Sequence, residues 1–185
     1  MITLIITPTY NEKKNIRVFI EKVFRYNSKA HLLIVDDNSP DKTGLEVKEL
    51  QKKFSNLFLI SRPKKKGLGT AYIEGFKWAL KKKYDFVVQM DADLSHDPKE
   101  IPTFINLLDK HEFVIGSRYA KGGKCEMPLL RLFLSIIGNK IIKFILKISC
   151  SEFTTSYRGF NLLKLNNFHL KEVKSKGYSF FMESI

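Results

Sequence analysis

Short β-branched apolar runs alternate with helical patterns through residues 1–119, and this alternation constrains the fold most. The runs that predict strands cover residues 2–7, 31–37, 57–61, 85–90 and 112–117. Between them, apolar residues recur at helical spacing over residues 13–26, 41–54, 69–83 and from 98 to about 110. Continuous apolar strands joined by helices predict an α/β fold, with a mostly parallel central sheet and helices on both faces.

The helix after the fourth strand has a predictable start. Asp97 is placed to cap it, Pro98 fits its first turn, and Glu100 stands where a capping box needs an acidic residue. Later in the chain, residues 154–164 return to a strand pattern and residues 165–170 resemble a short helix.

Length and composition predict one globular domain that buries a core, since the chain has 185 residues, 44% of them hydrophobic. The net charge of +13 favours anionic partners such as nucleotides, phosphorylated lipids or acidic membranes, although a solvated lysine-rich surface explains it equally well. Nucleic-acid binding would explain the charge but not the carboxylates that follow the strands. We therefore expect no nucleic-acid partner.

Cys125 and Cys150 stand alone without metal-ligand spacing, which favours a reducing compartment. The N-terminal apolar run predicts a first strand rather than a signal peptide. No apolar run approaches the roughly 18 to 20 residues of a membrane-spanning helix.

Residues 127–148 predict an amphipathic helix with basic residues on one side, suited to a membrane interface or to packing on the sheet. Those basic residues are Lys140, Lys143 and Lys147.

Polar residues follow all of the predicted strands. They form the segments 8–12, 36–41, 62–72, 91–96 and 117–119. Because parallel strands share one carboxyl edge, and ligands of such sheets bind beyond that edge, we expect these segments to meet in one site.

Asp91 and Asp93 flank Ala92 directly after the fourth strand. Paired carboxylates suit a hard divalent cation, Mg²⁺ or Mn²⁺, shared with substrate phosphates. An EF-hand loop is excluded, because its sixth and twelfth positions would be His96 and Pro102. The pattern also matches a phosphatase nucleophile motif that normally opens its domain, and an isolated pair would most simply cap and solvate a loop.

Other polar residues have two interpretations each. Asp37 can bond a ribose or base edge, or cap a helix; Tyr10 can stack on a base, or lie at a helix start. The glycines of "GLGTAY" resemble a phosphate-binding turn without a full motif. Arg118 suits bidentate phosphate binding, whereas His96 is expected to be a loop hydrogen-bonder rather than a catalyst.

Together these motifs carry a resemblance to a known family. "PTYNEKKNI", "IVDDNSPDKT", "RPKKKGLGTAY", "MDADLSHDPKEIP", "GSRY" and "TTSYRGF" follow in the order seen in dolichol-phosphate mannose synthases. Those enzymes are the polyprenyl-phosphate branch of the inverting nucleotide-sugar glycosyltransferases with the GT-A (Rossmann-like) fold. The chain resembles this branch over essentially its whole length.

The resemblance implies a glycosyltransferase that moves mannose from GDP-mannose onto a polyprenyl (dolichyl) phosphate by a single inverting displacement assisted by Mg²⁺ or Mn²⁺. Two alternatives remain: a related transferase with another donor such as UDP-glucose, or a non-catalytic nucleotide-sugar-binding subunit. The resemblance also implies a cytoplasmic protein associated peripherally with the cytoplasmic membrane face, which is the ER membrane if the source is eukaryotic.

The same resemblance assigns roles by position. Asp93 and Arg118 would be catalytic, Asp93 as principal metal ligand with Asp91, and Arg118 by steadying a phosphate of the donor or the acceptor. The residues expected to bind the donor are Pro8, Tyr10, Glu12, Val35, Asp37, Asp91, Ala92, Asp93 and Arg118, with Ser95 as a neighbour.

Residues 1–185 would form a single transferase domain, with a nucleotide-sugar half at 1–119 and an acceptor-side half at 120–185. Glu152 stands where the family usually has Asp, so its carboxylate is one methylene longer. Family members continue past "MESI" into further basic segments. We therefore expect a truncated acceptor-side half, in a shortened protein, a truncated reading frame, or one half of a split enzyme that a partner subunit completes.

Overall fold

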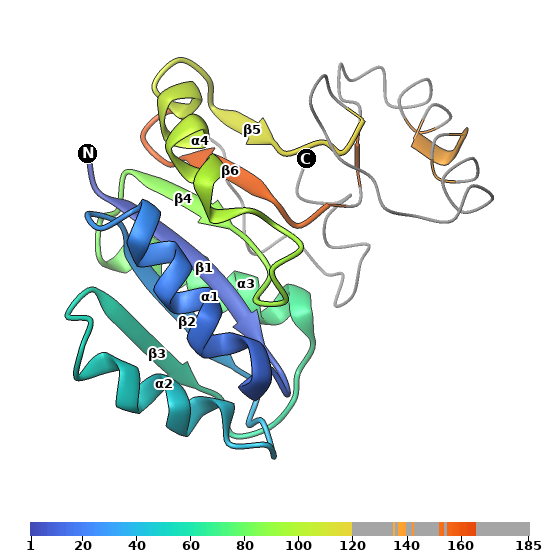
Figure 1. Cartoon of the computed structure of the whole chain (residues 1–185). Coiled ribbons are helices and arrows are strands. Elements are labelled where there is room, and N and C mark those ends of the chain that lie inside the picture. Colours follow the sequence, from blue (N-terminus) through green and yellow to red (C-terminus); the bar gives the residue numbers. More distant parts are fainter. Residues whose placement is uncertain (120–134, 136, 140–141, 143–151, 154, 166–185) are drawn as a thin grey trace.

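One six-stranded sheet forms the centre of the computed structural model (Figure 1). The structure describes residues 1–119, 135, 137–139, 142, 152–153 and 155–165. The strands are β1 (Thr3–Thr9), β2 (His31–Asp36), β3 (Leu57–Ser61), β4 (Phe86–Gln89), β5 (Phe113–Ile115) and β6 (Arg158–Asn161). Their order in the sheet is β3-β2-β1-β4-β6-β5.

The direction of β6 decides what lies at the carboxyl edge. Strands β1 to β4 are parallel, whereas β6 lies between β4 and β5 and is antiparallel to both. The mostly parallel sheet is thus confirmed, but β5 does not pair with β4. Because β6 runs backwards, the residues just before it lie beside the residues just after β4 and β5.

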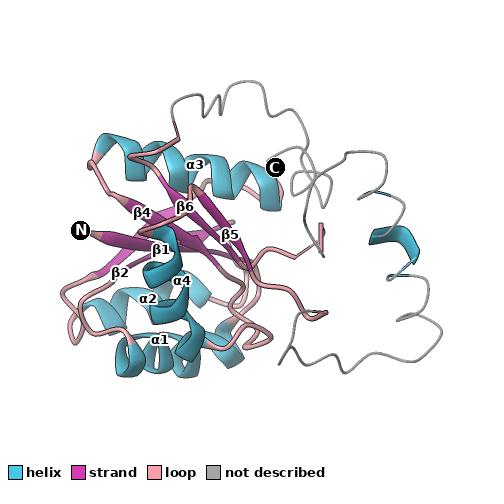
Figure 2. Ribbon diagram, turned by 90° about the horizontal axis from the view of Figure 1, so that it is seen from above, coloured by secondary structure: helices cyan, strands magenta, loops and turns pink. Residues whose placement is uncertain are grey.

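Helices cover both faces of the sheet, as predicted (Figure 2). They are α1 (Lys13–Tyr26), α2 (Thr43–Gln51), α3 (Leu68–Lys81) and α4 (Ile101–Leu108). Helices α1, α2 and α4 pack on one face around Phe19, Leu50 and Phe104. On the other face α3 packs against the sheet through Tyr72 and Phe76.

The predicted helix starts and ends need small corrections. Helix α2 covers Thr43–Gln51 instead of 41–54, since the Asp41 carboxylate accepts bonds from the Thr43 main chain (3.0 Å) and hydroxyl (2.6 Å). Of its three apolar residues Val47 and Leu50 are buried, but Leu45 is 55% exposed.

The predicted Asp97 cap is confirmed. Its carboxylate accepts the Lys99 N–H at 3.0 Å, and the turn η1 (Pro98–Glu100) leads into α4. The final strand covers only Arg158–Asn161 of the predicted 154–164. There the Asn161 side chain turns the chain, accepting the main-chain N–H groups of Leu163 (3.0 Å) and Lys164 (3.2 Å).

Most of the predicted amphipathic helix at 127–148 lies outside the described residues, as do its lysines, both cysteines and nearly all of residues 165–170. Within that stretch Ser135, 137–139 and Ile142 are helical. In the described part of the chain, no helix has the length and apolar character needed to cross a membrane.

Candidate active site

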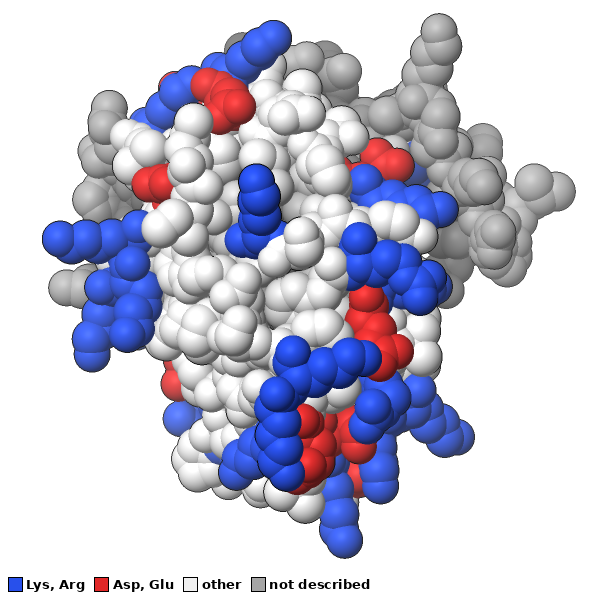
Figure 3. Space-filling view, turned by 60° about the vertical axis from the view of Figure 1, so that its left-hand side comes forward, with Lys and Arg blue, Asp and Glu red and all other residues white. Residues whose placement is uncertain are grey.

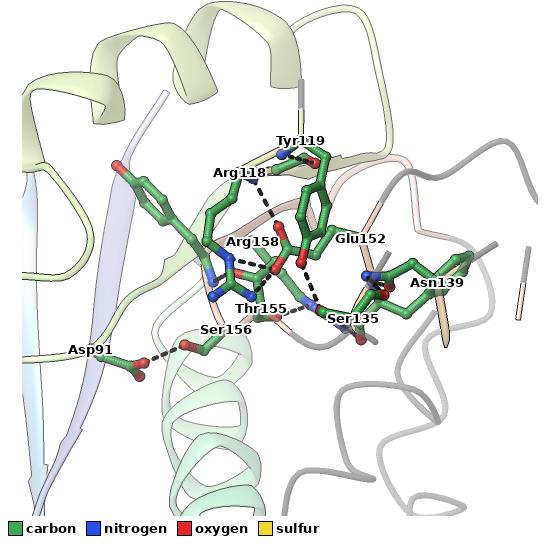
Figure 4. A network of polar contacts seen from close by, with 12 residues as sticks. Asp91, Arg118, Tyr119, Ser135, Asn139, Glu152, Thr155, Ser156 and Arg158 are labelled. Carbon is green, nitrogen blue, oxygen red and sulfur yellow. Dashed lines mark hydrogen bonds and ion pairs between the residues drawn. The ribbon is translucent and has the colours of Figure 1, made fainter. Parts of the chain in front are cut away.

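The polar segments predicted to meet do so at the carboxyl edge of the sheet, where the start of β6 joins them. Ser156, two residues before β6, donates its hydroxyl to the Asp91 Oδ2 at 2.6 Å. Arg118, three residues after β5, contacts Glu152 (Figure 4). The site therefore draws on β4, β5 and the segment before β6.

Asp91 and Asp93 have different surroundings although one residue separates them. The Asp91 carboxylate is held from both sides, by the Tyr72 hydroxyl at 3.2 Å and the Ser156 hydroxyl at 2.6 Å. Asp93 is exposed, and its Oδ1 accepts the main-chain N–H of Ser95 at 3.0 Å. One carboxylate is fixed in place, while the other is open to solvent.

The turn that follows Asp93 is strained. Leu94 adopts a left-handed conformation with φ of 66°, uncommon for a residue with a bulky side chain. Its side chain packs against the core beneath α1 and α4, while Ala92 is buried. Burial of these apolar side chains anchors the turn and leaves Asp93 on its outside.

His96 closes this turn as a hydrogen-bonding residue, as predicted. Its Nδ1 accepts the Asp91 main-chain N–H at 3.1 Å, so the neutral imidazole carries its proton on Nε2. The ring stacks on Tyr157 at 4.8 Å. Burial lowers the pKa of His96, opposed by the nearby carboxylates of Asp91 and Asp93. The charge of Arg118 lowers the pKa of His96 further, and the charge of Glu152 raises it.

Arg118 and Glu152 form a second polar centre. The Glu152 side chain has no exposed surface, and it accepts the Arg118 main-chain N–H at 2.8 Å and Nε–H at 2.9 Å. Nη2 of Arg118 bonds to the same carboxylate. The Arg118 side chain nevertheless keeps 42% of its surface exposed, so it is both held and accessible.

Asp37 is buried in an ion pair with Arg62. Its Oδ2 also accepts the main-chain N–H groups of Lys66 (3.1 Å) and Gly67 (3.2 Å). Gly67 has a φ of 97°, and α3 begins immediately after it. In this structure Asp37 therefore fixes the glycine turn at the start of α3.

The residues expected to form the nucleoside pocket lie around the ends of β1 and β2. Pro8 and Val35 are partners in the parallel register, and Val35 is fully buried. Tyr10 is 37% exposed, with the Lys65 ammonium 3.7 Å from its ring centre. Glu12 is half-buried; its main-chain N–H bonds to Thr43 at 3.0 Å.

Sequence reasoning missed the groups that orient these residues. Arg62 as the partner of Asp37, and Tyr72 and Ser156 as the partners of Asp91, were not predicted. Tyr72 ends the "GLGTAY" stretch and Ser156 lies in "TTSYRGF", but they stand 19 and 65 residues from Asp91. No spacing in the sequence links groups so far apart.

The donor set suits a hard divalent ion that is shared with substrate. Among the described residues, no group of three or more His, Cys, Asp or Glu side chains could hold a metal ion. Asp93 is exposed, and the oxygens of Asp91 retain accepting capacity beyond one hydroxyl each. Mg²⁺ and Mn²⁺ commonly use one or two carboxylates and complete their shell with water and phosphate oxygens, so the residues present fit such an ion.

Comparison with known proteins gives consistent results. Residues 4–166 match the family model for glycosyl transferase family 2. The polyprenol monophosphomannose synthase of Mycolicibacterium smegmatis is 39% identical, across 96% of this chain and 68% of that protein. The undecaprenyl-phosphate mannosyltransferase of Micrococcus luteus is 35% identical, across 97% of this chain and 74% of that protein.

Solved structures share the fold at lower identity. S. aureus TarS 1–349 in complex with UDP-GlcNAc has a TM-score of 0.67 at 18% identity, covering 100% of this chain and 53% of that one. The mannosyltransferase PcManGT from Pyrobaculum calidifontis, with GDP-Man and Mn²⁺, has a TM-score of 0.62 at 18% identity. That match covers 96% of this chain, which spans 50% of the solved one. The predicted GT-A fold is thereby confirmed.

Proposed function

This chain belongs to glycosyl transferase family 2, and from that premise we propose that it transfers mannose from GDP-mannose onto a polyprenyl phosphate with inversion. The names of its two relatives, at 39% and 35% identity, support a mannosyl donor and a polyprenyl-phosphate acceptor. The observation that carries the proposal is that one edge of the sheet holds both an exposed carboxylate, Asp93, and a partly exposed cation, Arg118.

The reaction would be a single displacement. An oxygen of the acceptor phosphate attacks the anomeric carbon, the bond from that carbon to the diphosphate oxygen breaks, and the nucleoside diphosphate departs with the electron pair. Because the attacking phosphate is already anionic near neutral pH, the step needs no strong general base. The protein has to align the two substrates and stabilise the leaving group.

Each residue at the edge has a place in this scheme. Asp93 would be the principal ligand of Mg²⁺ or Mn²⁺, with Asp91 beside it, and the bound ion would neutralise charge on the departing diphosphate. Arg118 would steady a phosphate of the donor or the acceptor. The remaining donor contacts would come from Pro8, Tyr10, Glu12, Val35, Asp37 and Ala92.

Tyr72 and Ser156 would keep the Asp91 carboxylate in one orientation, since both donate to it from different elements. The neutral Nδ1 of His96 would hold the Asp91 main chain in the turn. These groups act on the geometry of the site rather than on the reacting atoms.

We further propose that residues 1–119 provide the nucleotide-sugar half and residues 120–185 the acceptor-side half of one transferase domain. A lipid acceptor and a net charge of +13 favour peripheral contact with the anionic cytoplasmic face of a membrane. This chain spans 68% of the first relative's length and 74% of the second's.

The test is transfer of radiolabelled sugar to lipid-extractable product with Mn²⁺, using GDP-mannose and UDP-glucose as separate donors and a polyprenyl phosphate as acceptor. We expect label from GDP-mannose in the lipid phase. Label from UDP-glucose alone would support the related transferase instead. GDP binding without transfer from either donor would support the non-catalytic subunit.

A further inference from the structure

The Glu152 carboxylate accepts hydrogen bonds from both the main chain and the side chain of Arg118. We propose that Glu152 is a positioning residue that aims Arg118 at a phosphate group of the donor or the acceptor. This inference rests on the proposed function, in which Arg118 meets a phosphate during sugar transfer.

The first support is the number of bonds that one carboxylate makes to one residue. Oε2 of Glu152 accepts the Arg118 main-chain N–H at 2.8 Å, and Oε1 accepts Nε–H at 2.9 Å and Nη2–H. An arginine on a loop loses rotamer freedom when it grips a ligand. Fixing the residue at its main chain and its guanidinium removes part of that loss before the phosphate arrives.

The second support is the unequal burial of the pair. Glu152 has no exposed side-chain surface, whereas the Arg118 side chain is 42% exposed. The buried partner is thus the anion, and the cation reaches the solvent-facing side where an anionic substrate would approach. A role limited to filling the core would not require a carboxylate, since burying a charge is costly even when it is paired.

The charges also distinguish positioning from attraction. Glu152 partly cancels the positive charge of Arg118, so it weakens the pull of Arg118 on any phosphate. If attraction alone mattered, removing the Glu152 charge would tighten phosphate binding. Positioning predicts the opposite, because a misdirected guanidinium loses its bidentate contact with the phosphate.

A third support is that the residues after each partner are tied to one further segment (Figure 4). The Tyr119 hydroxyl bonds to Ser135 at 2.7 Å, and the Phe153 main-chain N–H donates to Asn139 at 3.1 Å. Asn139 in turn donates to the Ser135 carbonyl at 3.0 Å. The residues that follow both members of the ion pair are therefore bonded to Ser135 and Asn139.

The test uses the full chain with steady-state kinetics in which donor and acceptor are varied separately. In Glu152→Gln, the amide replaces one accepting oxygen with an N–H donor, so some of the hydrogen bonds that hold Arg118 are lost. We expect kcat to fall about tenfold to a hundredfold, the loss typical of a reacting group displaced by about 1 Å. The KM that changes identifies which substrate's phosphate Arg118 meets.

Two further variants separate positioning from folding. Glu152→Asp keeps the charge with a shorter reach and should retain more activity than Glu152→Gln. Glu46→Gln is the matched control, because Glu46 pairs with Arg17 through one oxygen on the outer surface and should transfer sugar like the wild type. Wild-type or higher activity of Glu152→Gln, or equal loss in both Glu152 variants, would overturn the inference.

Arg118→Lys completes a double-mutant cycle, since lysine keeps the positive charge but lacks the planar guanidinium that can donate two parallel hydrogen bonds. If Glu152 acts through Arg118, adding Glu152→Gln to Arg118→Lys should change kcat less than about twofold; two independent, multiplying losses would contradict this.

A measurement that needs no turnover separates this inference from the proposed function. In ¹⁵N-labelled protein, the Nε–H of Arg118 should exchange slowly with solvent in the wild type and faster in Glu152→Gln, with and without inorganic pyrophosphate. If the wild type transferred no sugar, this difference would still support positioning, whereas equal exchange rates would refute it.

Discussion

At the scale of single residues, the carboxylate of Asp37 joins the end of β2 to the glycine turn before α3. It pairs with Arg62, which is 3% exposed, and accepts the N–H groups of Lys66 and Gly67. Arg62 also donates to the Gly67 carbonyl at 3.2 Å and to the Thr70 hydroxyl at 2.8 Å. A buried ion pair therefore sets the conformation of the glycine turn before α3.

Replacing Asp37 by Asn should destabilise the protein by about 3 kcal/mol, the lower end for breaking a buried ion pair. We expect the lower end because Glu74 lies 3.8 Å from Nη1 of Arg62 and offsets part of the uncompensated charge. Urea unfolding measures the change. In Glu46→Gln the broken pair is on the surface, and the cost should stay below about 1 kcal/mol. Equal losses of unfolding free energy in the two variants would show that the buried pair stabilises the protein no more than the surface pair does.

His31 and Tyr84 should make stability depend on pH. The His31 Nδ1 lies 2.6 Å from the Tyr84 hydroxyl, which keeps its proton because burial raises the pKa of Tyr84 to about 12. Burial lowers the pKa of His31 from its ordinary 6.5. The unfolded chain therefore binds a proton first as the pH falls below about 6.5, so folding weakens there and is unaffected at higher pH.

The measurement is the urea midpoint at pH 7.5 and pH 5.0 in the wild type and in His31→Asn. The wild type should lose more of its stability on acidification than the variant does. The comparison cancels the other titrating groups, and an identical loss in both proteins would rule out this role for His31.

Residue types indicated much of the site before the structure did. A carboxylate pair after an apolar strand predicted a cation site, and the isolated His96 predicted a loop hydrogen-bonder, which the structure confirms. The sequence could not predict that Asp91 is fixed while Asp93 is exposed. That difference depends on hydroxyls from Tyr72 and Ser156, and only folding brings these side chains to Asp91.

At the scale of elements, the approach of α3 to the sheet depends on Gly75. A Cβ atom there would lie 2.6 Å from Cγ2 of Ile6 in β1, inside any normal contact. Tyr72, which bonds Asp91, lies one helical turn earlier on the same helix. Close packing at Gly75 therefore helps to set the position of a hydroxyl in the site.

Gly75→Ala should destabilise the fold by about 1–3 kcal/mol through overpacking, although alanine suits a helix better than glycine by about 1 kcal/mol. Thermal and urea unfolding measure this loss. Combining it with Ile6→Ala, which makes room for the added methyl group, should cost less than the sum of the single changes. Strict additivity would show that the two residues do not compete for space.

Hydrophobic periodicity predicted the strands and helices of residues 1–119 well, because each is short and its apolar residues face one core. It could not predict that β6 enters the sheet between β4 and β5. The four residues Arg158–Asn161 form a fully buried strand that is antiparallel to both neighbours. That insertion places Ser156 and Glu152 in the site.

At the scale of the whole molecule, the net charge of +13 says little about where a substrate binds. On the face shown in Figure 3, basic side chains form separate groups, several of them beside acidic ones. Arg17, Lys52 and Lys53 are each paired with a glutamate. The phosphate-binding proposal therefore rests on Arg118 and the carboxyl edge rather than on overall charge.

The most direct test of the proposed site is a calorimetric titration of GDP into the wild type and into Asp93→Asn, with and without Mn²⁺. We expect Mn²⁺ to strengthen GDP binding to the wild type by about tenfold or more, equivalent to about 1.4 kcal/mol. In Asp93→Asn this gain should disappear while binding without metal persists, because the expected nucleoside contacts at the ends of β1 and β2 are unchanged. An equal gain from Mn²⁺ in both proteins would contradict the assignment of Asp93 as the metal ligand.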